Sequence, residues 1–273
     1  PDADQLARLV ALGPPVRLRV ALDCGWDGTA DSFNVIGEIT GSHRKLRDEV
    51  VVIGGHLDSW DLGTGAIDDG AGVAITMAAG HLIGRLPKAQ RPARTIRVIA
   101  FANEEQGLYG GKAYAAQFKV DVAKHQLVAE SDFGAGRIYG FNTGAAAHAK
   151  TAVAQIAEAL KPLGIETMSK GGAGPDVGPI AAEGAAWAWL GQDGTDYFDY
   201  HHTPDDTLDK IDPAALAQNT AAYAVFAYLA ASAEGGFGSA PKAPEPATTA
   251  KPWSKTTALV GATEVAMLLL FSD

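Results

Sequence analysis

The sequence has a single cysteine, no run of basic residues and no long hydrophobic stretch. Cys24 alone cannot form an intrachain disulfide, which excludes a disulfide-stapled scaffold. With 22 Lys and Arg against 32 Asp and Glu, the net charge of −10 argues against nucleic acid and anionic membranes as partners. The apolar segment at 266–271 is shorter than the roughly 20 residues of a membrane-spanning helix. The 273 residues, 47% hydrophobic, are enough for one α/β domain.

The two ends of the sequence differ in composition from its middle. The beginning lacks a starting Met and the basic and apolar segments of a signal peptide, so we expect a processed or shortened chain. Residues 235–254 are rich in Gly, Pro, Ala and Lys, which predicts a linker followed by a weakly packed tail to residue 273. Residues 1–234 are therefore predicted to form the folded domain, with 235–273 as a disordered extension.

Strand and helix patterns alternate along the predicted domain. Apolar runs predict strands at 16–23, 33–40, 50–54, 95–102, 127–131, 138–141 and 185–190. Helical periodicity predicts helices at 2–12, 70–86, 108–118, 145–160 and 213–231. This alternation predicts an α/β fold with a mostly parallel central sheet and helices on both faces.

Acidic and histidine side chains gather at the ends of four predicted strands. In an open α/β sheet, ligands bind beyond the carboxyl ends of the strands. The residues that follow these strands include His56 and Asp58, Glu104 and Glu105, Glu130 and Asp132, and His201 and His202. Asp68 and Asp69 precede the predicted helix at 70–86. Imidazole and carboxylate together suit zinc better than calcium, and this set is large enough for two divalent ions.

Taken singly, each of these features has an ordinary explanation. A His-x-Asp pair is usually a hydrogen-bonded pair, two adjacent Glu residues usually form a solvated turn, and Asp68 and Asp69 could cap a helix. These explanations are independent of one another and predict no common location. The placement of all these residues at one edge of the predicted sheet therefore favours a metal site.

Five segments, in this order, resemble the co-catalytic zinc exopeptidases, the family of zinc aminopeptidases and glutamate carboxypeptidases. They are GGHLDSWD at 54–61, GAIDDGAG at 65–72, NEEQG at 103–107, ESD at 130–132 and HTPDDT at 202–207. The segment at 34–42 is similar to the carboxypeptidase Q group within that family. The resemblance covers residues 1–232 and implies a phosphorylase/hydrolase-like fold, a peptide substrate and a periplasmic or secreted location. That group carries a protease-associated-like domain upstream, which this chain is expected to lack.

The resemblance also implies a role for each site residue. Two zinc ions are implied, with other divalent ions as alternatives, and the two sites share Asp68. The first ion would be held by His56, Asp68 and Asp132, and the second by Asp68, Glu105 and His202. Glu104 would be the general base that works with a metal-bridging hydroxide to hydrolyse a peptide bond. Nearby positions with supporting roles would be Asp58, which orients His56, Asp69, which aims Asp68, and His201, which lies near the substrate.

Two other functions remain open from the sequence. A glutaminyl cyclase-like transferase would use one zinc ion, and a non-catalytic binding module of the same fold would have no activity. The choice between aminopeptidase, dipeptidase and carboxypeptidase is open as well, as is a homodimer. Asp176 is either a partner for a substrate ammonium group or a helix cap. Trp60, Trp187 and Trp189 either line the substrate pocket or pack in the core.

Overall fold

The computed structural model describes residues 2–13, 16, 17, 21, 23, 25 and 28–239. Helix α1, Asp2–Ala11, confirms the helix predicted at 2–12 and belongs to a separate unit from the one that begins at residue 31. The predicted strand at 16–23 lies largely outside the described residues, and so does the predicted tail from residue 240. The account below concerns residues 31–239.

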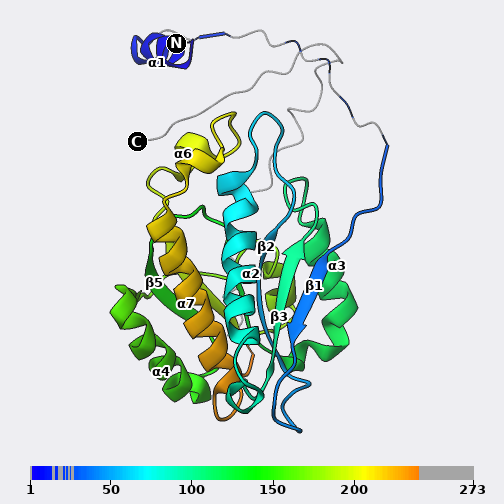
Figure 1. The fold of residues 1–273 in the computed structure, drawn as a ribbon. Coiled ribbons are helices and arrows are strands. Elements are labelled where there is room, and N and C mark those ends of the chain that lie inside the picture. The colour runs from blue at the N-terminus through cyan, green and yellow to red at the C-terminus, as the bar shows by residue number, and fades with distance from the viewer. Residues whose placement is uncertain are drawn as a thin grey trace. The chain divides into compact units, whose positions relative to one another are not determined.

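A seven-stranded sheet forms the centre of this unit (Figure 1). Its strands are β1 Val35–Ile39, β2 Val50–His56, β3 Thr95–Phe101, β4 His125–Glu130, β5 Ile138–Gly144, β6 Glu166–Thr167 and β7 Trp187–Gln192. They lie in the order β1-β3-β2-β4-β7-β5-β6. The four central strands β3, β2, β4 and β7 are parallel, whereas β1 and β5 run antiparallel to β3 and β7. The prediction of a mostly parallel sheet is confirmed.

Helices cover both faces of the sheet. One face packs against α2 Ala71–Gly84, α4 Lys150–Leu160 and α7 Pro213–Ser232, which lie side by side in Figure 1. The other face packs against α3 Tyr109–Phe118 and α5 Gly178–Ala182. The connecting segments are α6 Tyr197–Tyr200, a π turn at Ala66–Gly70, and 3₁₀ turns at Lys88–Gln90, Lys119–Lys124, Ala147–Ala149, Lys161–Leu163 and Leu208–Lys210.

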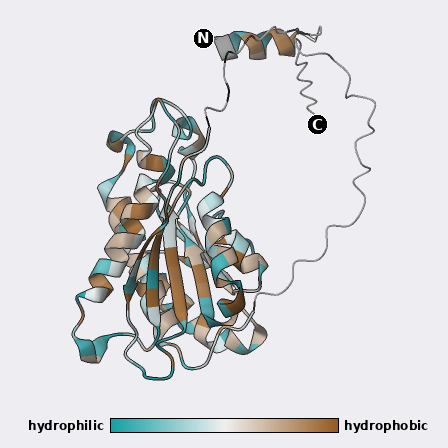
Figure 2. Cartoon of the chain, turned by 90° about the vertical axis from the view of Figure 1, so that its right-hand side faces the viewer, coloured by the Kyte–Doolittle hydropathy of each residue, from teal (hydrophilic) through white to brown (hydrophobic). Residues whose placement is uncertain are grey.

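Strand β2 explains why the central strands read as continuous apolar runs. Val51 and Ile53 join the core cluster beneath α2 and α7, whereas Val50 and Val52 join the cluster beneath α3 and α5. Successive side chains point to opposite faces of a strand, so a strand buried on both faces needs apolar residues at every position. Figure 2 shows the resulting hydrophobic colour along the strands in the interior.

The packed part of the chain extends beyond the boundary predicted at residue 234. Phe237 is fully buried, and its carbonyl accepts a hydrogen bond of 2.8 Å from Ala146 N. The buried Arg94 guanidinium donates to Glu49 Oε2 and to the carbonyls of Ala233 and Gly235. These contacts tie the segment after α7 to the amino edge of the sheet. Among the described residues, no helix is long and apolar enough to cross a membrane.

Candidate metal centre

The carboxyl ends of the parallel strands bring the predicted site residues together. His56 is the last residue of β2 and pairs in register with Phe101, the last residue of β3. Asp132 follows β4 by two residues, and Glu104 follows β3 by three. Parallel strands end at one edge of a sheet, so these side chains meet although they are distant in sequence.

The first group of ligand atoms surrounds the imidazole of His56. Its Nδ1 lies 2.8 Å from the carbonyl oxygen of Asp58, which can only accept, so Nδ1 donates and Nε2 faces the opposite way. Nε2 lies 3.1 Å from Asp68 Oδ1 and 3.3 Å from Asp132 Oδ1. Burial lowers the pKa of His56, but its hydrogen bonds to Asp132 and Asp68 outweigh burial and raise that pKa to about 12. A proton and a divalent ion would therefore compete for the Nε2 lone pair of His56.

The second group forms around the other oxygen of Asp68. His202 Nε2 lies 3.1 Å from Asp68 Oδ2 and 2.9 Å from Glu105 Oε2. The indole nitrogen of Trp60 donates to the same Glu105 oxygen at 2.7 Å, and its ring meets His202 edge-on. His201 stacks on His202 with ring centroids 3.5 Å apart and places Nε2 3.3 Å from Asp68 Oδ2. Asp68 thus faces the first group with Oδ1 and the second group with Oδ2.

The donor set fits divalent metal ions. Within the part of the chain that the structure describes, buried Asp68 Oδ2 and Glu105 Oε1 have no hydrogen-bond donor of suitable geometry. Three carboxylates that converge with two imidazoles leave excess negative charge, which a shared cation would neutralise. The donor atoms within each of the sets His56, Asp68, Asp132 and Asp68, His201, His202 lie within 4.8 Å of one another.

The Asp58 carboxylate holds the loop that carries the two adjacent glutamates. Its Oδ1 accepts from Glu104 N at 2.9 Å and its Oδ2 accepts from Glu105 N at 3.1 Å. Asp58 therefore orients His56 through its backbone carbonyl, while its side chain fixes the glutamates. One carboxylate oxygen of Glu104 lies within 4.8 Å of ligand atoms on His56 and Glu105. Burial, reinforced by the charges of Asp132 and Glu105, raises the pKa of Glu104 to about 7.

The Asp69 carboxylate bonds to the backbone at the end of β2 and at the start of α2. Its Oδ2 accepts from His56 N at 3.0 Å and its Oδ1 accepts from Gly72 N at 3.1 Å, near the start of α2. The peptide bond between Asp68 and Asp69 is cis. A Cβ at Gly72 would overlap the carbonyl oxygen of Ser131, so the close approach of α2 to the end of β4 requires glycine there.

The structure also places the residues whose roles the sequence left open. Asp176 makes no side-chain cap at α5, and its Oδ1 accepts instead from Gly111 N in the first turn of α3 at 3.1 Å. Of the three tryptophans, Trp60 adjoins the second group, Trp187 packs against the core and Trp189 meets Tyr139 edge-on.

Asp206, which the sequence reasoning did not single out, is buried beside Asp68 and accepts from its backbone amide at 3.1 Å.

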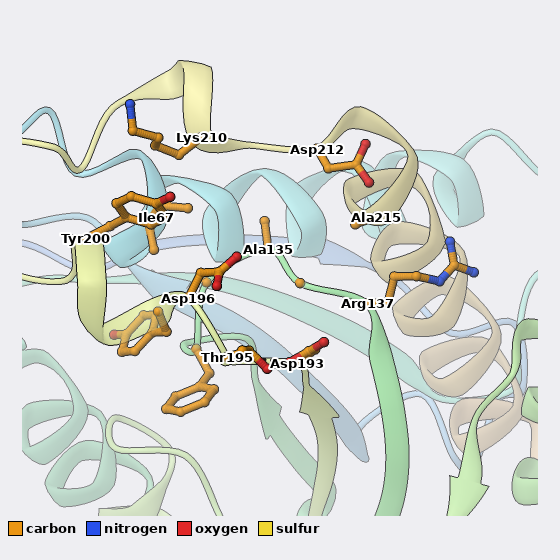
Figure 3. Close-up of a pocket in the computed structure, with 14 residues that line it drawn as sticks. Ile67, Ala135, Arg137, Asp193, Thr195, Asp196, Tyr200, Lys210, Asp212 and Ala215 are labelled. Atoms are coloured by element: carbon orange, nitrogen blue, oxygen red, sulfur yellow. Dashed lines mark hydrogen bonds between the residues drawn. The ribbon is translucent and has the colours of Figure 1, made fainter.

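A cavity of about 260 Å³ is lined in part by residues adjacent in the chain to two of the proposed ligands (Figure 3). Ile67 and Phe133, the chain neighbours of Asp68 and Asp132, form part of its wall. Tyr197 stacks on Phe133 and meets the His201 ring at a tilt. Further polar residues around the cavity are Arg137, Asp193, Thr195, Asp196, Tyr200, Lys210 and Asp212.

Comparison with known proteins identifies the family. Residues 34–227 match the family model described as Peptidase family M28. The chain belongs to peptidase family M28. It is 35% identical over 233 residues to carboxypeptidase Q of Bos taurus and, over the same length, to carboxypeptidase Q of Homo sapiens. The matches cover 85% of this chain but 48% of those relatives, so the chain spans about half the length of the curated family members it matches.

Solved structures agree with this family and with the α/β fold. The peptidase M28 precursor from Shewanella amazonensis SB2B is 51% identical with a TM-score of 0.73, and the match covers 78% of this chain and 47% of that one. The aminopeptidase from Aneurinibacillus sp. strain AM-1 is 25% identical with a TM-score of 0.58, over 77% of this chain and 50% of that one.

Proposed function

We propose that this chain is the catalytic part of a metal-dependent exopeptidase that hydrolyses dipeptides or other short peptides. The observation that carries the proposal is the position of Asp68, with Oδ1 3.1 Å from His56 Nε2 and Oδ2 3.1 Å from His202 Nε2. A carboxylate that faces two imidazoles, one from the end of a strand and one from a loop, is suited to bridge two cations. Membership of peptidase family M28 and relatives named carboxypeptidase and aminopeptidase support this activity.

Two divalent ions, zinc by preference, fit the two groups. His56, Asp68 and Asp132 would hold one ion, and Asp68, Glu105 and His202 would hold the other. When bound, such ions supply Lewis-acid chemistry, because they lower the pKa of a coordinated water and polarise a peptide carbonyl. The pairing of Glu105 with His202 supports two ions over the single zinc of a glutaminyl cyclase-like enzyme.

Glu104 is the proposed general base. Its backbone is fixed by Asp58, and its carboxylate lies beside His56 and Glu105 without belonging to either group of three ligands proposed above. From this position it would take a proton from the attacking water as the oxygen bonds to the peptide carbon. It would then deliver that proton to the amine nitrogen as the C–N bond breaks.

His201 is the proposed contact for the substrate carbonyl. Its ring is partly exposed, stacks on His202 and lies against Asp68. An imidazole N–H in this place could donate to the oxygen on which negative charge develops during attack. We further propose a periplasmic or secreted enzyme, in keeping with the resemblance to the carboxypeptidase Q group.

Metal analysis and a peptide panel test the proposal together. The purified protein should bind two zinc ions per chain, and Asp68→Ala should lower this number and abolish hydrolysis. The panel compares dipeptides with N-blocked and C-amidated peptides, so that the required terminus separates an aminopeptidase from a carboxypeptidase. Saturation with a single ion, or unchanged binding by Asp68→Ala, would overturn the two-ion proposal.

A further inference from the structure

Asp206 connects the loop that carries Asp68 to the loop that carries His202. Its Oδ1 accepts from Ile67 N at 2.5 Å, and its Oδ2 accepts from Asp68 N at 3.1 Å. Its backbone carbonyl accepts from Thr64 N at 2.8 Å and from Thr64 Oγ1 at 3.1 Å. In the described part of the chain, every hydrogen bond between residues 62–68 and residues 201–207 ends on Asp206.

The same residue is tightly packed and belongs to a short, internally bonded turn. Asp206 is 4% exposed, and a Cβ added at Gly63 would lie 2.7 Å from Thr203 O and 3.0 Å from Asp206 Cβ. Asp206 N donates to Thr203 O, and Thr203 N and Oγ1 both donate to Tyr200 O. This turn carries His202 at its start and Asp206 at its end. A fixed Asp206 therefore fixes the position of His202 relative to Asp68.

The first group of ligands does not depend on this connection in the same way. His56 ends β2 and donates its backbone N–H to Asp69, and Asp132 follows the end of β4 by two residues. His202 lies ten residues beyond the end of β7, on a loop that the sheet does not hold. Loss of the Asp206 carboxylate should therefore disturb the second group more than the first.

We propose that Asp206 is a positioning residue that holds His202 against the bridging Asp68 and thereby sets the affinity of the second metal site. The inference rests on the proposed two-ion function. Two backbone N–H donors satisfy the buried carboxylate, and charge-assisted bonds of this kind are stronger than neutral ones. Residues that orient metal ligands typically change metal affinity 10- to 100-fold when they are replaced.

The test compares Asp206→Ala with Asp205→Ala by zinc titration of the metal-free protein. Asp205 is the neighbouring exposed carboxylate of the same turn and has no side-chain hydrogen bond among the described residues, so its loss controls for charge. We expect Asp206→Ala to weaken the second ion by about 10- to 100-fold and the first by less than about 3-fold, and Asp205→Ala to change neither. The visible spectrum of the Co²⁺-substituted protein should change only for the second equivalent.

A conservative variant keeps the result interpretable. Asp206→Asn keeps one acceptor oxygen but turns an N–H₂ group toward the other backbone N–H, so the second-ion affinity should fall between the wild type and Asp206→Ala. Circular dichroism and thermal melting check the fold of each metal-free variant. If Asp206→Ala does not fold, the zinc affinities of Asp206→Asn provide the test instead. Equal weakening of both ions, or the same effect from Asp205→Ala, would refute the role of Asp206. A wild type that takes up one ion would instead refute the proposed function.

Discussion

The two groups of proposed ligands that share Asp68 are held by different means. His56 and Asp132 come from the ends of β2 and β4, and their side chains are 1% and 9% exposed. Glu105 and His202 come from loops, and His202 is 39% exposed. The backbone of the first group is fixed by the strand ladder together with the Asp69 carboxylate, whereas the second group has no strand and relies on the carboxylates of Asp58 and Asp206. The comparison teaches that one half of a shared site can be rigid by topology while the other half depends on individual side chains.

The largest expected effect comes from Glu104, which lies between the two groups. Glu104→Gln keeps the shape but removes the basic carboxylate, so we expect kcat to fall by about 10³-fold while both ions stay bound. Peptide hydrolysis and metal content, measured on one preparation, check this. Glu105→Gln is the contrast, because it should weaken the second ion. If Glu104→Gln lost metal as readily as Glu105→Gln, the assignment of base and ligand would be wrong.

The next effect concerns the stability of the metal-free protein. His56→Ala removes the imidazole that faces Oδ1 of the buried Asp68 and Oδ1 of the largely buried Asp132, so the free energy of unfolding should fall by about 3–5 kcal/mol. His202→Ala removes a partly exposed partner and should cost about 0–1 kcal/mol. Urea denaturation in the presence of a chelator measures both. Equal losses would break the distinction between a strand-held and a loop-held group.

A smaller effect should appear at Trp60, whose indole N–H bonds to Glu105. Trp60→Phe keeps an aromatic ring but removes the donor, so the second ion should bind about 10-fold more weakly and the first should be unaffected. Calorimetric zinc titration resolves the two steps. Trp189→Phe in β7 is the matched control, because the Trp189 ring meets Tyr139 and makes no hydrogen bond to a proposed ligand in the described part of the chain. A change in the first ion would show that the two groups are not held separately.

The smallest effect lies at the amino end of β4, away from the metal centre. Burial lowers the pKa of His125, whose Nε2 lies 2.8 Å from the Tyr114 hydroxyl. The unfolded chain therefore takes up a proton at a higher pH than the folded one. The free energy of unfolding should fall as pH drops below about 6.5, by up to about 1.4 kcal/mol per unit of pKa difference.

The contribution of His125 to this pH dependence can be separated from that of the proposed ligand histidines by comparing a His125 variant with the wild type. His125→Gln should reduce the slope of unfolding free energy against pH relative to the wild type, and His81→Gln, at an exposed position, should not. Urea denaturation between pH 5 and 8 supplies the slopes. An unchanged slope in His125→Gln would contradict the assigned cause.

Sequence reasoning recovers the long elements and misses the short ones. Strands such as β2 and β3 are predicted within two residues of their observed ends, because burial on both faces produces uninterrupted apolar runs. The two-residue β6, the five-residue α5 and the four-residue α6 are too short to show a period. The Gly-rich segment after α7 is predicted to be a linker, and the burial of Phe237 is not visible in its composition.

The sequence predicts that the candidate site residues lie together, but it does not predict the contacts that hold them. The five proposed ligands lie together as the strand ends imply, but what each supporting carboxylate contacts depends on loop backbone that has no sequence period. Asp58 bonds to the amides of Glu104 and Glu105 because Asn103, at a φ of 56°, turns the chain there. Asp206 likewise reaches amides 138 and 139 residues away. Such contacts follow from three-dimensional placement alone.

The contacts of Arg94 set a limit on how far this domain can be shortened. Two of the acceptors of its buried guanidinium are the carbonyls of Ala233 and Gly235, and both lie beyond the last residue of α7. A chain trimmed at the end of that helix would retain every proposed ligand but leave a buried cation with Glu49 as its remaining acceptor among those described. The minimal folding unit therefore ends after α7, at a residue that the five motif segments do not reveal.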